Sequence, residues 1–65
     1  MPPLKRITED VVRGIQKNLK EFGYTVEYDY VKAQVDGLAR GEQPTDIVAM
    51  FARDMLVKNG FLDEA

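Results

Sequence analysis

The side chains able to do chemistry in this sequence are carboxylates, amines, guanidinium groups and tyrosines, because it contains no histidine, cysteine, serine or tryptophan. Ser–His and Cys–His nucleophilic systems cannot be assembled from these residue types, and neither can a zinc site with the usual nitrogen and sulfur ligands. Two acidic pairs remain, Glu9/Asp10 and Asp63/Glu64. Neither has the oxygen ligands at alternating positions around a glycine that a calcium loop needs.

The glycines do not form a phosphate-binding loop, because they are scattered singly along the chain. Paired carboxylates can exchange protons with a substrate, but a domain of 65 residues encloses little interior in which a pocket could form. We therefore predict a non-enzymatic protein with no catalytic residue, no cofactor, no metal ion and no small-molecule substrate.

The composition is that of one small globular domain, with 45% hydrophobic and 31% charged residues. The lack of cysteine fits a reducing compartment. The longest apolar runs are far shorter than a membrane span, and the positive charges near the N-terminus are not followed by the apolar segment of a secretory signal. These features predict a cytoplasmic protein with no membrane-spanning segment.

The net charge of −2 is divided unevenly along the chain. Residues 1–22 carry five Lys/Arg against three acids, and residues 23–65 carry four against eight. An acidic chain of this kind is not expected to bind the phosphate backbone of nucleic acids. The basic side chains of the first segment, Arg13, Lys17 and Lys20, are either a solvated face or a dock for an acidic protein.

Three segments have apolar residues at the three- and four-residue spacing of amphipathic helices. They cover residues 9–22, 26–40 and 44–58. Short connections join them, which predicts an all-α fold, a compact three-helix bundle. The third segment is the most apolar, and we expect the other two to pack around its ridge, which is formed by Ile47, Phe51 and Met55.

Capping residues and glycines mark both ends of each predicted helix. The expected starts are Thr8, Thr25 and Pro44. Each helix is expected to end at a glycine in the left-handed conformation, and these are Gly23, Gly41 and Gly60. The domain then spans residues 8–62, between a flexible N-terminal segment at 1–7 and a C-terminal tail at 63–65.

Residues 24–31 also fit a β-strand, because three tyrosines and a valine alternate there with polar residues. A lone strand needs a pairing partner, and no second strand is visible in the sequence. Apolar residues continue with helical spacing from Tyr28 through Leu38. The helix is therefore the preferred interpretation, and the strand is the alternative.

The second and third predicted helices are compatible with a helix-turn-helix motif, because only residues 41–43 separate them. The recognition helix would open with Thr45 and Asp46 and would offer only Arg53 and Lys58 as bases. A helix that enters the major groove normally does so amid positive charge. A DNA-binding regulator is therefore the alternative function, and nucleic acid is not the expected partner.

Apolar side chains on the outer faces of the second and third helices indicate a surface for a partner. At about 100° per residue, the side of the second helix opposite Val35 carries no charge, and Met50 and Val57 lie on one line of the third. Such stripes can also belong to the core of a bundle, but three helices cannot easily cover both. The predicted partner-binding residues are Val26, Tyr30, Ala33, Gly37, Met50, Arg53 and Val57.

These observations predict a small acidic helical protein-protein interaction domain. Its partner would be another protein or a second copy of the same chain. A regulator, an adaptor or a subunit of an assembly would each have these properties.

Overall fold

The computed structural model describes residues 3–64, and this part of the chain contains three α-helices and no strand. The helices are α1 (Glu9–Glu21), α2 (Tyr28–Ala39) and α3 (Ile47–Lys58). The predicted all-α three-helix fold is confirmed. The alternative of a strand over residues 24–31 is wrong, because residues 24–27 form an irregular connection and α2 begins at Tyr28.

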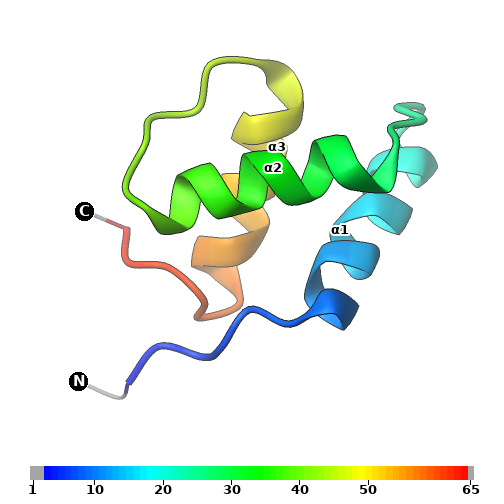
Figure 1. Cartoon of the computed structure of the whole chain (residues 1–65). Helices are drawn as coiled ribbons and strands as arrows, with labels where there is room; N and C mark the ends of the chain where they lie inside the picture. Colours follow the sequence, from blue (N-terminus) through cyan, green and yellow to red (C-terminus); the bar gives the residue numbers. More distant parts are fainter. Residues whose placement is uncertain (1–2, 65) are drawn as a thin grey trace.

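Helix α2 crosses α1 and α3, which run in opposite directions (Figure 1). Contacts between side chains fix the register of this antiparallel pair. The Phe22 and Phe51 rings meet edge to face with centroids 5.1 Å apart, and Asn18 Nδ2 lies 3.6 Å from Met55 Sδ. Asn18 precedes Phe22 by four residues and Met55 follows Phe51 by four, so these two contacts match one turn of α1 with one turn of α3 in the opposite direction.

The core is formed by one inward-facing line of side chains from each helix. Its members are Val12, Ile15 and Leu19 of α1, Val31, Val35 and Leu38 of α2, and Val48, Ala52 and Leu56 of α3. Burial of these apolar side chains is the main stabilising contribution available to so small a domain.

The prediction that Ile47, Phe51 and Met55 form the centre of the core is wrong, because these side chains lie at the side of the core or on the surface. Ile47 is 54% exposed, while Phe51 and Met55 are half-buried and pack against the core from its side. The line that points inward includes Ala52 and lies about 100° further round the helix, one residue later in the sequence. This orientation also buries Ala49. Small side chains on the buried face let α2 approach α3 closely.

All three helices end at the predicted glycines, which have φ of 97° at Gly23, 92° at Gly41 and 85° at Gly60. The hydrogen bonds are those of a Schellman motif. After α1, for example, the Gly23 N–H donates to the Lys20 carbonyl at 2.9 Å and the Tyr24 N–H to the Leu19 carbonyl at 2.8 Å. Left-handed φ is far less costly for glycine than for other residues, so these three positions set where the chain turns.

Two of the three predicted helix starts, Thr25 and Pro44, need correction. Thr8 is the N-cap of α1, but its side chain makes no capping hydrogen bond. The N-cap of α2 is Glu27 and not Thr25, and it too lacks a side-chain cap. Helix α3 begins after Asp46, so that Pro44 precedes the helix and is not in its first turn. Among the three N-cap residues, only Asp46 makes a side-chain capping hydrogen bond, because its carboxylate accepts from the Ala49 N–H.

The N-terminal segment is held against the C-terminal turn by contacts that the expectation of a flexible segment over residues 1–7 did not include. The Lys5 N–H donates to the Gly60 carbonyl at 2.9 Å, and the Lys5 ammonium lies 5.7 Å from the centroid of the Phe61 ring. Ile7 packs against the core. Met1 and Pro2 lie outside the described residues.

Replacing Gly14 by alanine is expected to raise the free energy of unfolding by about 0.5–1 kcal/mol, because glycine is the weaker helix former. Gly14 lies within α1, and a Cβ at this position would meet nothing within 4 Å. Urea denaturation measures the change. Gly23→Ala is the matched control, and it should lower the stability because Gly23 has positive φ. A loss of stability in Gly14→Ala would contradict the open surroundings of this residue.

Candidate protein-binding surface

The predicted stripe on α2 is partly covered by the chain itself. Ala33 and Gly37 line a hollow of about 100 Å³ together with residues 42–45 of the loop that leads into α3. Gly37 is buried, and Glu42 Oε1 lies 2.8 Å from the place that a Cβ at Gly37 would occupy. The space that Gly37 leaves open is therefore filled by the Glu42 side chain of the same chain. Ala33 remains exposed.

Tyr30 is 43% exposed, but its hydroxyl is engaged with the start of α3. The hydroxyl donates a hydrogen bond to Asp46 Oδ2, while Asp46 Oδ1 accepts one from the Ala49 N–H at 2.8 Å. The bond from Tyr30, followed by that from the Ala49 backbone, lowers the pKa of Asp46. The same bond raises the pKa of Tyr30. This contact joins α2 to the N-cap of α3.

The other predicted residues differ in how far they reach the surface. Met50 is 55% exposed, whereas Val26, Arg53 and Val57 are half-buried. The Val26 carbonyl accepts a hydrogen bond from Gln16 Nε2 at 3.0 Å. Arg53 Nη2 donates to a backbone carbonyl of the C-terminal segment at 3.1 Å. The structure therefore does not bring the seven predicted residues together as one open surface.

A more continuous apolar surface lies around the first two turns of α3. Phe22 is 72% exposed, Met50 55% and Ile47 54%, and the half-buried Phe51 contacts Phe22. Met50 and Phe51 follow Ile47 by three and four residues, so the three side chains are neighbours on the helix surface. We call Phe22, Ile47, Met50 and Phe51 the apolar patch.

The apolar patch continues into a groove between α1 and α3. A hollow of about 270 Å³ includes Phe22 and Phe51, and one of about 160 Å³ includes Gly14 and Phe61. The two hollows share their lining at Asn18, Met55 and Asn59. Gly14, which has no Cβ, leaves this part of α1 open.

Sequence reasoning placed Met50 on the outer face of its helix but assigned Ile47 and Phe51 to the ridge around which the bundle packs. Phe22 is the C-cap of α1 and Ile47 is the first residue of α3. The ends of a helix can project past the elements that cover its middle, so an apolar residue there is a weaker indication of burial. The positions of Phe22 and Ile47 at helix ends are the feature of the sequence that could have indicated their exposure.

Two other kinds of functional feature, a metal-binding cluster and a membrane-spanning helix, were sought among the described residues. Among residues 3–64, no group of three or more acidic side chains is placed to hold a metal ion. Within the same part of the chain, every helix is too short or too polar to cross a membrane.

Comparison with known proteins gives this chain no family assignment. No family model, no curated protein and no solved structure matches it.

Proposed function

We propose that this protein is a small non-enzymatic domain that binds another protein, or a second copy of itself, through the apolar patch. The observation that carries the proposal is the exposure of three large apolar side chains, Phe22, Ile47 and Met50, next to the partly exposed Phe51. Contiguous apolar surface of this kind tends to mark an interaction site.

The distribution of polar groups supports a protein partner. The carboxylate of Asp54 and the ammonium of Lys58 lie beside the patch, since both line the hollow that contains Phe22 and Phe51. An apolar centre with charged groups at its edge is typical of protein interfaces. Aromatic and methionine side chains, which the patch contains, are also enriched there.

The same features favour protein over DNA. The outward side of α3 carries Ile47, Met50 and Asp54, so a carboxylate would face the phosphates of a duplex. Arg53 points instead toward the C-terminal segment, where it donates to the Glu64 carbonyl. The helix-turn-helix alternative therefore has less support than a protein-binding role.

The proposal is tested with the double variant Ile47→Asp and Met50→Asp. Because both side chains are more than half exposed, we expect a folded protein whose binding or self-association is weakened at least about tenfold. Sedimentation equilibrium over a range of concentrations measures self-association. Quantitative capture of proteins from the source cell, with each variant immobilised, measures binding to others.

The matched control is Leu4→Asp with Ala39→Asp, which adds the same charge at two exposed residues that line a different hollow. It should behave as the unmodified protein does. Circular dichroism verifies that both double variants are folded. The proposal fails if the Ile47/Met50 variant associates and captures proteins as strongly as the control.

A further inference from the structure

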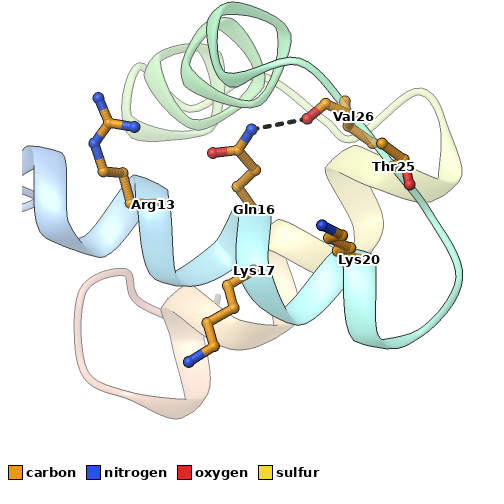
Figure 2. Close-up of a pocket in the computed structure, with 6 residues that line it drawn as sticks. All are labelled: Arg13, Gln16, Lys17, Lys20, Thr25 and Val26. Atoms are coloured by element: carbon orange, nitrogen blue, oxygen red, sulfur yellow. Dashed lines mark hydrogen bonds between the residues drawn. The ribbon is translucent and has the colours of Figure 1, made fainter.

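A second surface, separate from the apolar patch, lies between α1 and the segment that leads into α2. It is a hollow of about 320 Å³ lined by Arg13, Gln16, Lys17, Lys20, Thr25 and Val26, which we call the basic pocket. In Figure 2, Gln16 points to the Val26 carbonyl, with Arg13 and Lys20 on either side of it. Lys17 extends away from these three at the edge of the pocket (Figure 2). The hydrogen bond from Gln16 Nε2 to the Val26 carbonyl, 3.0 Å long, fixes the wall opposite α1.

The lining of the basic pocket contains three cationic side chains and no carboxylate. Arg13 is partly neutralised, because it pairs with Glu9 at 2.8 Å and lies over the Tyr28 ring, 4.5 Å from its centroid. These two contacts hold the guanidinium in place. Lys17 and Lys20 take part in none of the ion pairs found among residues 3–64.

We propose that the basic pocket binds an acidic segment of a partner protein, with one Glu or Asp carboxylate at Lys20 and another at Arg13, on the two sides of Gln16 (Figure 2). Carboxylates accept hydrogen bonds from both of these cations. The aliphatic stems of the lysines and the Val26 side chain supply apolar contact for a residue next to the carboxylate. The site goes beyond the apolar patch and does not rest on it, because it lies on another side of α1 and uses charge.

The charge of the chain selects a short acidic segment over a nucleic acid. Residues 23–65 carry eight acids against four Lys/Arg, so a long polyanion lying across the molecule would meet repulsion outside the pocket. A few carboxylates confined to the pocket would not. The wall formed by Thr25 and Val26 limits the size of the group that can enter.

The experiment uses a synthetic decapeptide of glutamate alternating with leucine, and the same peptide with glutamine in place of glutamate. Amide chemical shifts of the ¹⁵N-labelled protein are followed by NMR during titration. We expect the glutamate peptide to shift Gln16, Lys17, Lys20 and Val26 and the glutamine peptide to shift none of them. Raising the salt concentration should weaken the binding.

The variant Lys17→Gln with Lys20→Gln should reduce the affinity for the glutamate peptide by about three- to tenfold. The control Arg6→Gln with Lys32→Gln removes the same charge from exposed residues that line neither the basic pocket nor the hollow beside the apolar patch, and it should change the affinity little. Equal weakening by the two double variants, or shifts centred elsewhere, would overturn the proposal. Equal affinity for a thymidine decanucleotide at the same salt concentration would also overturn it.

Discussion

Leu56→Ala is expected to lower the free energy of unfolding by about 2–5 kcal/mol. Leu56 is 1% exposed and belongs to the core line of α3, so the truncation removes apolar contacts and leaves a cavity. A domain of 65 residues is expected to have a total stability of roughly 3–10 kcal/mol. The loss is a large share of that total, so the variant should unfold at a clearly lower urea concentration than the unmodified protein, which urea denaturation followed by circular dichroism measures.

The matched control for Leu56→Ala is Ile47→Ala on the same helix. Ile47 is 54% exposed, and removal of its side chain should change the stability by less than about 0.5 kcal/mol. The comparison is a direct test of which side of α3 faces inward. If Ile47→Ala costs as much as Leu56→Ala, the ridge predicted from the sequence is the core and the orientation of α3 in the structure is wrong.

The buried face of α3 lies one residue later in the sequence than predicted, which shows that helical periodicity does not determine which side of a helix faces the core. Apolar residues occur in adjacent pairs, such as Ile47 with Val48 and Met55 with Leu56, so two neighbouring lines of the helix have nearly equal apolar content. The spacing predicts a helix but does not choose between these lines. The choice depends on which line offers small residues where α2 packs, and Ala52 lies on the line that is buried.

The ends of the helices were predictable because their cause is local. Only glycine adopts φ near +90° without steric cost, so Gly23, Gly41 and Gly60 could be identified without knowledge of the tertiary structure. The starts were less predictable, since a Thr at an N-cap must also turn its hydroxyl toward the first turn. Thr8 occupies the N-cap of α1 but makes no such bond.

The candidate site was only partly predictable because it depends on long-range packing. The stripe with Ala33 and Gly37 looked free in the sequence, yet the loop through Glu42 folds back over part of it. Ile47 was predicted to be a core residue, yet it lies at the start of α3, past the packed middle of the helix, and is 54% exposed. Neither outcome follows from the residues of one helix alone, since each is set by how the helices and loops cover one another.

Asp46→Ala is expected to destabilise the protein by about 1–2 kcal/mol, because the carboxylate is the N-cap of α3. It accepts hydrogen bonds from the Ala49 N–H and from the Tyr30 hydroxyl of α2. The substitution therefore removes both the cap and the link between the two helices. Tyr30→Phe removes the link alone and should cost less than Asp46→Ala.

The pH dependence of stability identifies this contact independently. The hydrogen bonds from Tyr30 and from the Ala49 backbone hold the pKa of Asp46 below its ordinary value. The stabilisation from Asp46 is thus fully present above the pKa of an unfolded Asp, about 3.9, and is lost as the pH falls through the lower pKa of the folded state. The pKa of Tyr30 is raised by the same bond, so its contribution is present below about pH 10 and is lost as the pH rises further.

Urea denaturation between pH 2 and pH 6 measures the acid limb of this dependence for the unmodified protein, Asp46→Asn and Tyr30→Phe. The amide introduced by Asp46→Asn can still cap the helix but does not titrate, so this variant should lose stability less steeply on acidification than the unmodified protein does. Tyr30→Phe should show an intermediate slope, since the Ala49 N–H still lowers the pKa of Asp46. Identical acid profiles for all three proteins would mean that the carboxylate of Asp46 is not held by these donors in solution.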